Sequence, residues 1–195
     1  MMRLVTLSLL LVGSLTMTAQ TAIRDVFKQM PANVVPYLVE NNRLDFIDFI
    51  DSDMKAEVTN AFGGKSEMLK LTDDYLSLRL SDATSMEMRL LEVTEPVDSA
   101  SQIVCLVTTY GNVSSKAQES VVAFYSLKWQ PLPAERYMQL PKEMFVATFG
   151  EPGEQEPSLV VTPVCRLDAP ANEEQKEINK PSTILKWRGG FVNEN

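Results

Sequence analysis

The acid–base chemistry open to this chain is limited by the complete absence of histidine. Histidine is the only side chain whose ordinary pKa lies in the physiological range. Without it the chain has no Ser-His-Asp triad, no Cys-His nucleophile pair and no His-ligated zinc or haem site. Any catalysis would have to use carboxylates, lysine, tyrosine or a metal held by oxygen atoms. We expect no cofactor and no metal.

Four acids lie close together in the sequence: Asp45, Asp48, Asp51 and Asp53. The first three share the polar side of a predicted helix, whereas Asp53 falls on its apolar side. Oxygen ligands of this kind suit calcium, but an EF-hand loop that began at Asp51 would carry Lys55 at its fifth position. It would also lack the glycine at position six and the closing glutamate. The pattern therefore predicts the solvated face of an amphipathic helix.

Two pairs of adjacent acids, Asp73-Asp74 and Glu173-Glu174, invite comparison with glycosidases, which use two carboxylates. Adjacent acids are common on protein surfaces, and Asp73 fits a turn ahead of the strand that is predicted to begin at Tyr75. We predict no catalytic residue from these pairs, and a carboxylate-based hydrolase acting on glycans remains the alternative function.

Gly64-Lys65-Ser66 matches the end of a phosphate-binding P-loop. The complete motif requires a glycine five positions before Gly64, where the chain has Thr59, and the loop must open a helix after a strand. Here it follows a predicted helix and precedes predicted strands, so the motif does not predict nucleotide binding.

Cys105 and Cys165 are the only cysteines, which is too few for a four-cysteine zinc site. Their separation excludes a CxxC redox motif. If the chain is exported, a disulfide between them is favoured by the compartment. Two buried thiols are the other interpretation, because free cysteine is among the most buried residue types.

Aromatic residues concentrate in the second half of the chain, where they could form a stacking surface for a sugar or peptide. We select Trp129, Trp187 and Phe191 as candidate ligand-binding residues, with Tyr110, Tyr125 and Tyr137 as further members of the group. At strand positions such residues more often belong to the core. Phe191 follows Gly189-Gly190 and is expected to be the most exposed.

Charge and length exclude some partners. The 195 residues include 18 Lys+Arg and 26 Asp+Glu, a net charge of −8, with no basic cluster for nucleic acid. Residues 1–19 have the layout of a secretory signal peptide: Arg3, a short apolar run from Leu4 to Val12, and small residues up to Ala19. The apolar run is shorter than a bilayer span of about 20 residues, and no later segment suits one. We predict a single domain over residues 20–195 in the periplasm or outside the cell.

The hydrophobic pattern changes along this domain. It predicts a helical region within residues 22–40, which Pro31 and Pro36 divide into two short pieces. A separate helix is predicted over residues 43–57. Alternation then predicts a β-hairpin from Leu76–Leu80 and Met86–Leu90, and further strands over residues 103–110, 121–129, 159–167 and 184–188. Residues 141–149 fit either a helix or a strand. The order predicts an α+β fold, with N-terminal helices packed on a mainly antiparallel β-sheet.

A weak internal similarity links two segments. Val104-Cys105 is followed by Leu127-Lys128-Trp129, and Val164-Cys165 by Leu185-Lys186-Trp187. A duplicated strand–loop–strand unit would place the two cysteines side by side. Chance similarity is the simpler interpretation, because few residues match.

The chain resembles a family of uncharacterised secreted proteins of Bacteroides-type bacteria, defined by a domain of unknown function. The similarity rests on residues 41–48 (NNRLDFID), 71–78 (LTDDYLSL) and 124–129 (FYSLKW). It implies a Gram-negative envelope setting and provides no catalytic residues.

These observations predict a secreted or periplasmic, non-enzymatic module that binds an envelope protein, a peptide or a glycan. A cleft with two carboxylates about 5–10 Å apart would favour the hydrolase instead. An exposed aromatic patch or an unpaired strand edge would favour binding.

Overall fold

The computed structural model describes residues 22–111, 118–164 and 181–193. Strands make up 47% and helices 14% of this part of the chain. The helices are α1 (Ile23–Lys28), α2 (Glu40–Asp51) and the 3-10 helix η1 (Ala134–Arg136). The strands are β1 (Glu57–Thr59), β2 (Lys65–Leu71), β3 (Tyr75–Ser81), β4 (Thr84–Val97), β5 (Ala100–Tyr110), β6 (Glu119–Tyr125), β7 (Pro131–Leu132), β8 (Phe145–Phe149), β9 (Ser158–Pro163), β10 (Thr183–Trp187) and β11 (Phe191–Asn193).

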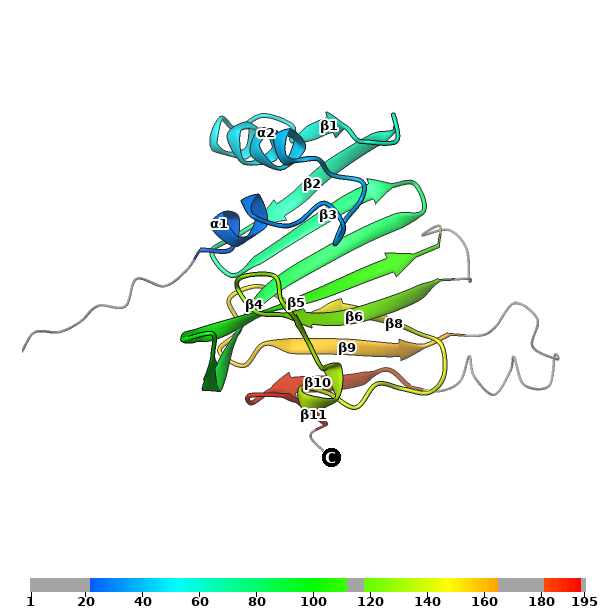
Figure 1. Cartoon of the computed structure of the whole chain (residues 1–195). Helices are drawn as coiled ribbons and strands as arrows, with labels where there is room; N and C mark the ends of the chain where they lie inside the picture. Colours follow the sequence, from blue (N-terminus) through cyan, green and yellow to red (C-terminus); the bar gives the residue numbers. More distant parts are fainter. Residues whose placement is uncertain (1–21, 112–117, 165–180, 194–195) are drawn as a thin grey trace, which may run out of the picture.

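The first sheet contains β1 to β7 in chain order, and every neighbouring pair is antiparallel (Figure 1). The predicted hairpin is confirmed, since Leu76 lies opposite Met88 and Leu78 opposite Met86. These four side chains share one face because successive strand residues point to opposite sides. That face belongs to a helix-side core with Phe27 of α1.

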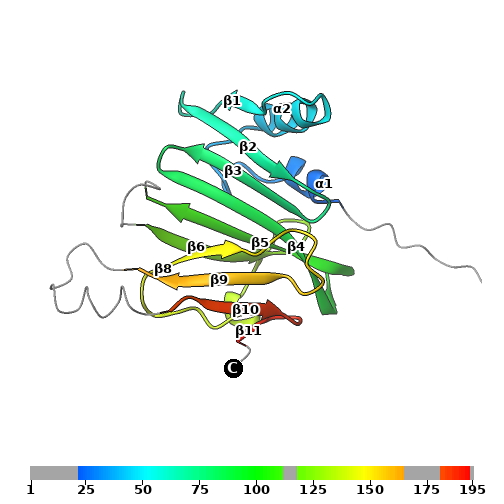
Figure 2. The same ribbon diagram turned by 180° about the vertical axis from the view of Figure 1, so that it is seen from behind.

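The second sheet has the order β11-β10-β9-β8 and is also antiparallel throughout. Seen from behind, β8 lies over β6, β9 and β10 follow below it, and β2 and β3 remain uncovered (Figure 2). The ambiguous residues 141–149 contain a strand, β8, and Pro163 is the last residue of β9.

An inter-sheet core fills the space between the two sheets. The first sheet contributes residues such as Ile103, Cys105 and Phe124, on the face opposite the helices. The second sheet contributes Phe145, Ala147, Phe149, Leu159, Val161, Trp187 and Phe191. Strand β5 therefore buries side chains on both faces, which explains why residues 103–107 read as a continuous apolar run.

The predicted α+β fold with N-terminal helices packed on one sheet is wrong. The described chain is mostly β, with two sheets and only one helix of seven or more residues. The predicted helices were too long, since α1 ends at Lys28 and α2 ends at Asp51. The strands assigned to one sheet separate into two, since alternation identifies a buried face without identifying what covers it.

Polar side chains of the first sheet accept hydrogen bonds from backbone N–H groups on the free edge of β8. Ala147 and Phe149 are alternate residues, so their N–H groups point from the same edge of the strand. Ser120 Oγ accepts a hydrogen bond from Ala147 N (2.9 Å), and Glu87 Oε2 accepts one from Phe149 N (3.0 Å). Tyr75 donates its hydroxyl to Glu87 Oε1 (2.7 Å). These bonds join β3, β4, β6 and β8 into one polar junction.

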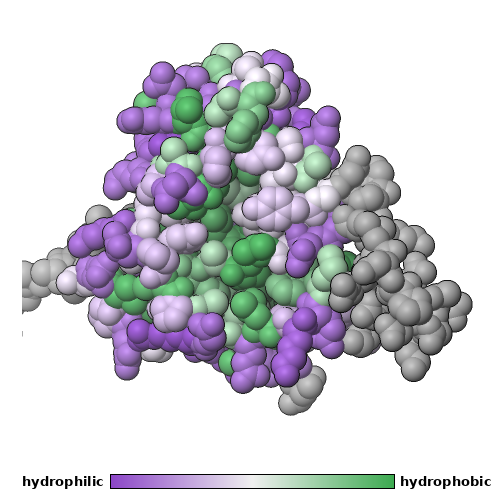
Figure 3. Space-filling model, turned by 45° about the vertical axis from the view of Figure 1, so that its right-hand side comes forward, coloured by the Kyte–Doolittle hydropathy of each residue, from purple (hydrophilic) through white to green (hydrophobic). Residues whose placement is uncertain are grey.

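Hydrophobic residues also reach the surface on another side of the molecule. Figure 3 shows them gathered in a hollow that hydrophilic residues surround. Among the described residues, Tyr110 and Val121 are about half exposed. Exposed apolar side chains are expected on any soluble domain, so they do not by themselves indicate a binding site.

The junction predicts the effect of Ser120→Ala. The substitution leaves the buried Ala147 N–H without an acceptor, so the free energy of unfolding should fall by about 1–2 kcal/mol in urea titrations. Ser101→Ala on the exposed part of β5 is the matched control and should have little effect. Equal losses for the two variants would contradict this role of Ser120.

Glu87 should also make stability depend on pH. Burial raises the pKa of its carboxyl above the ordinary 4.5, against the lowering effects of Tyr75, Phe149 N–H and Arg89. The folded protein therefore binds this proton more tightly than the unfolded chain, and the resulting stabilisation is lost as the pH rises through the folded-state pKa. Unfolding free energies of wild type and Glu87→Gln should be measured from about pH 4 to about pH 8. The wild-type value minus the variant value should decrease as the pH rises, whereas a constant difference would contradict the prediction.

Candidate functional site

The three aromatic residues predicted to bind a ligand lie in two different cores. Trp129 is buried in the helix-side core, and its indole N–H donates to the carbonyl of Val26 (3.0 Å). Trp187 and Phe191 lie together in the inter-sheet core, with ring centroids 5.0 Å apart. All three side chains are at most 6% exposed, so no open aromatic surface joins them. Binding through these residues stays a prediction.

Trp187 nevertheless borders a cavity of about 420 Å³, which we call the Trp187 pocket. It lies at the left-hand ends of the strands in Figure 1, where β4 continues past the start of β3 and faces the β8–β9 loop and the β10–β11 turn. Trp187 donates its indole N–H to the carbonyl of Glu92 (2.6 Å), which ties the second sheet to β4. The polar residues that line the pocket are Asp74, Glu92, Thr94, Gln102, Glu154, Gln155 and Arg188.

A buried arginine, Arg89, holds the carboxylate of Asp74 in place. Arg89 is completely buried and its Nε lies 3.3 Å from Asp74 Oδ2, while Thr72 Oγ1 donates to Asp74 Oδ1 (3.0 Å). The two Nη atoms of Arg89 have no hydrogen-bond partner within the described part of the chain. A charge buried in this way is stabilised by its counter-ion, so Arg89 and Asp74 hold each other in place.

The remaining carboxylates of the pocket differ in their partners. Glu154 Oε2 accepts a hydrogen bond from Ser158 Oγ (2.7 Å) and lies 3.9 Å from Lys186 Nζ. Glu92 is exposed, and its side chain has neither an ion pair nor a hydrogen bond among the described residues. The pocket therefore presents one carboxylate that the fold does not use.

A second cavity, of about 460 Å³, lies beside β11. It is lined by two short segments, residues 135–139 and 190–193, together with Leu185. Phe191 N donates to the carbonyl of Tyr137, and a side chain at Gly190 would come within 3.1 Å of that carbonyl oxygen. The two segments are thus held close together.

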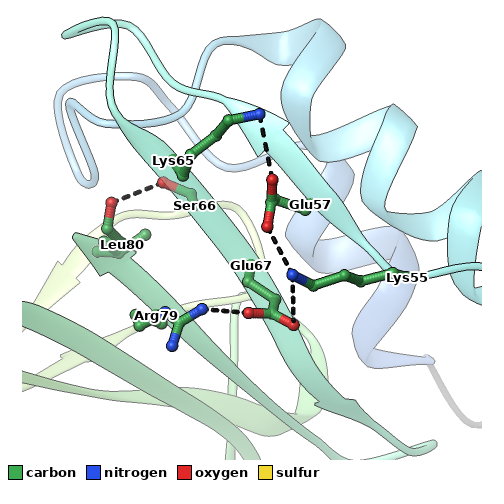
Figure 4. Close-up of polar contacts among 7 residues, drawn as sticks. All are labelled: Lys55, Glu57, Lys65, Ser66, Glu67, Arg79 and Leu80. Carbon is green, nitrogen blue, oxygen red and sulfur yellow. Dashed lines mark hydrogen bonds and ion pairs between the residues drawn. The ribbon is translucent and has the colours of Figure 1, made fainter. Parts of the chain in front are cut away.

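A cluster of charged side chains lies across β1, β2 and β3 (Figure 4). Lys65 pairs with Glu57 (3.1 Å), Lys55 bridges Glu57 (2.7 Å) and Glu67 (3.8 Å), and Arg79 pairs with Glu67. Three cations and two carboxylates nearly cancel in charge. Exposed pairs of this kind contribute little to stability, and the cluster keeps the uncovered face of β2 and β3 polar.

This cluster also explains the Gly64-Lys65-Ser66 sequence. Lys65 and Ser66 are the first residues of β2, where Lys65 serves the ion pairs and Ser66 is completely buried. Ser66 Oγ donates to the carbonyl of Leu80 (2.7 Å). A phosphate-binding loop would instead need Ser66 accessible at the start of a helix.

The acidic helix face occurs as predicted on α2, where Asp45, Asp48 and Asp51 are exposed and Asp51 pairs with Arg24 of α1 (3.1 Å). Asp53 lies just beyond the helix with a positive φ of 53°. The described residues contain no group of three or more acids or cysteines that could hold a metal ion. They also include no helix long and apolar enough to cross a membrane.

Cys105 is completely buried in the inter-sheet core, and no other described residue is bonded to its sulfur. Burial, and then the charge of Glu87, raise its pKa well above the ordinary 9.0, which makes the thiol unreactive. Cys165 and the pair Glu173-Glu174 lie outside the described residues, so the disulfide stays a prediction. The two segments proposed as duplicates lie in different sheets. The first copy includes Val104-Cys105 of β5 in the first sheet, and the second includes residues 185–187 of β10 in the second sheet.

Of the residues that line the pocket, the sequence analysis selected only Trp187 as a candidate, and it considered Asp74 within an acidic pair from which no site residue was predicted. Glu92, Gln102 and Glu154 come from two strands and a loop, and no short motif connects them. The detectable signal was the polar interruption of two strands that are otherwise apolar. Gln102 stands just before the buried run from Ile103 to Val107, where a polar side chain requires an explanation.

Comparisons with known proteins give the family and the fold. The family described as a protein of unknown function, DUF3256, matches residues 14–153. A solved structure, a domain of an uncharacterized protein from Porphyromonas gingivalis, has a TM-score of 0.69 at 18% identity. The match covers 88% of this chain and 97% of that chain, and at this identity it shows the fold alone. No curated protein sequence matches. The predicted resemblance to a domain of unknown function is confirmed, whereas secretion stays a prediction. Because the family match spans more than half of its length, the chain belongs to the DUF3256 family of proteins of unknown function.

Proposed function

We propose that this protein is an exported, non-enzymatic module that binds a short glycan in the Trp187 pocket. The observation that supports the proposal is the composition of that pocket. Carboxylates and amides line one cavity there together with Trp187. Its volume of about 420 Å³ falls within the range of about 300–1,000 Å³ that is usual for small-ligand sites.

The polar lining favours a sugar over an apolar ligand. Each sugar hydroxyl donates one hydrogen bond and accepts others, so it is best matched by groups that offer both functions. Carboxylates accept, and the amides of Gln102 and Gln155 both donate and accept. Arg188 adds a donor at the rim, where it also pairs with Glu156 (3.4 Å). This distribution of donors and acceptors is the main reason for preferring a glycan to a hydrophobic peptide.

Binding without turnover is favoured because two of the three carboxylates have structural roles. Asp74 accepts from Arg89 and Thr72, and Glu154 accepts from Ser158. The alternative, a carboxylate-based glycan hydrolase, is supported by one fact: Asp74, Glu92 and Glu154 line the same cavity. A hydrolase of this type needs one carboxyl as a proton donor and a second as a base or nucleophile.

Export is the second part of the proposal. It rests on the pattern of residues 1–19 described above, in which Arg3 precedes a short apolar run and small residues. The ligand would then be a glycan of the periplasm or of the cell surroundings.

Filling the pocket should abolish glycan binding. Thr94 is exposed and lines the pocket, so Thr94→Trp would occupy the cavity without disturbing a core. A soluble glycan library screened with wild-type protein by microarray, followed by calorimetry on the best ligand, should give binding that Thr94→Trp reduces more than tenfold. Thr148→Trp, on the exposed outer face of β8, is the control and should bind like wild type.

The same samples separate binding from hydrolysis. Release of new reducing ends from the bound glycan, lost in a Glu92→Gln variant, would establish the hydrolase and overturn the non-enzymatic proposal. Failure of every glycan to bind, with the two tryptophan variants indistinguishable, would overturn the assignment of the pocket.

Export predicts processing of the N-terminus. When the full chain is produced in a Gram-negative host, the protein recovered from the periplasmic fraction should begin at Gln20 by intact-mass analysis. Replacing Leu9 and Leu10 in the apolar run by Arg should leave the protein unprocessed in the cytosol. A full-length periplasmic protein, or an unprocessed wild type in the cytosol, would contradict the prediction.

A further inference from the structure

The charges around the Trp187 pocket do not balance. Asp74 is matched by Arg89 (3.3 Å), Arg188 by Glu156 (3.4 Å), and Glu154 has Lys186 at 3.9 Å. Glu92 is the pocket carboxylate for which the described residues supply no cation. A ligand that brought a positive charge to Glu92 would therefore complete the charge pairing of the pocket.

Gln102 provides an independent reason to expect a ligand. It lines the pocket and is only 7% exposed, yet its side-chain amide makes no hydrogen bond to any described residue. The amide atoms of Gln102 are not among the fully buried atoms that lack a partner, so they are accessible from the cavity and can bond to a ligand. Gln102 lies directly opposite Glu92 in the pairing of β4 with β5. The unused amide and the unused carboxylate are thus cross-strand neighbours.

We propose that the pocket recognises a glycan that carries a free ammonium group, that is, an amino sugar without an N-acetyl group. This inference rests on the proposed function of the pocket as a glycan site. The ammonium has three N–H donors and no acceptor, which suits the carboxylate of Glu92 together with the amide oxygen of Gln102. The amide nitrogen of Gln102 then remains to donate to a neighbouring hydroxyl.

Other charged ligands fit this pocket less well. The described residues contain no group of three acids or cysteines that could hold a metal ion, so a divalent cation lacks a ligand set. An anionic sugar would face Glu92 and Glu154, and like charges at short range repel. An N-acetylated sugar would present a neutral amide to Glu92 and would leave its charge uncompensated.

The test compares two trisaccharides that differ only at nitrogen, a glucosamine trimer and its N-acetylated form, by calorimetry at slightly acidic pH. Wild type should bind the glucosamine trimer more tightly, and added salt should weaken this binding. Glu92→Gln should weaken it about fivefold and leave the N-acetylated trimer unaffected. Glu95→Gln is the matched control, because Glu95 lies on the same strand, is 80% exposed and pairs with Arg136 (2.9 Å). Gln102→Met should weaken both trimers.

The outcomes separate this inference from the proposed function. Equal affinity for the two trimers, or equal effects of Glu92→Gln and Glu95→Gln, would overturn recognition of the ammonium while leaving a glycan site. Binding of a trilysine peptide in place of the glucosamine trimer would also overturn it, by assigning the ammonium to a peptide. If wild type binds no glycan of the library, both proposals fail. Thermal unfolding midpoints equal to wild type confirm that the variants are folded.

Discussion

The edge of β8 is the constraint on which the two-sheet architecture depends. An edge strand presents N–H groups that need acceptors, and burying them against apolar side chains would be costly. Here Ser120 and Glu87 reach from the first sheet to the N–H groups of Ala147 and Phe149. The edge of the second sheet can therefore pack against the face of the first sheet, while the remaining side chains form a continuous apolar core.

Placing Glu87 at this position imposes conditions on its neighbours. A buried carboxylate needs donors or a positive charge. Tyr75 donates its hydroxyl to Glu87, and the charge of Arg89 acts on the same carboxylate. Burial, and then the hydrogen bond to Glu87, raise the pKa of Tyr75 as well, so the phenol remains a donor. Arg89 extends the polar junction to Asp74 and thus to the Trp187 pocket. The elements that fasten the sheets together consequently also fix one wall of the candidate site.

The strands could be predicted from sequence where alternation was clear, and the hairpin of β3 and β4 is the best example. Residues 141–149 could not be assigned to a helix or a strand from sequence, although the part that forms β8, Phe145–Phe149, carries strand-forming residues. The division into two sheets could not be predicted, since Ile103 and Cys105 point to the inter-sheet core whereas Val104 and Leu106 point to the helix-side core. An apolar run records burial on both faces and does not reveal that one cover is helical and the other a second sheet. For the same reason Trp187 could be selected as an aromatic residue near a site, but the polar residues beside it come from distant strands.

The order of the strands has a consequence for biogenesis. Each sheet is a meander whose neighbours are also consecutive in the chain, so pairing can follow synthesis from the N-terminus. The face of the first sheet that carries Ile103, Cys105 and Val107 nevertheless has no cover until residues 145–161 have emerged. During that interval the nascent protein exposes an aggregation-prone apolar surface, which favours chaperone binding or delayed folding. The exposure ends when the strands of the second sheet pack on this face.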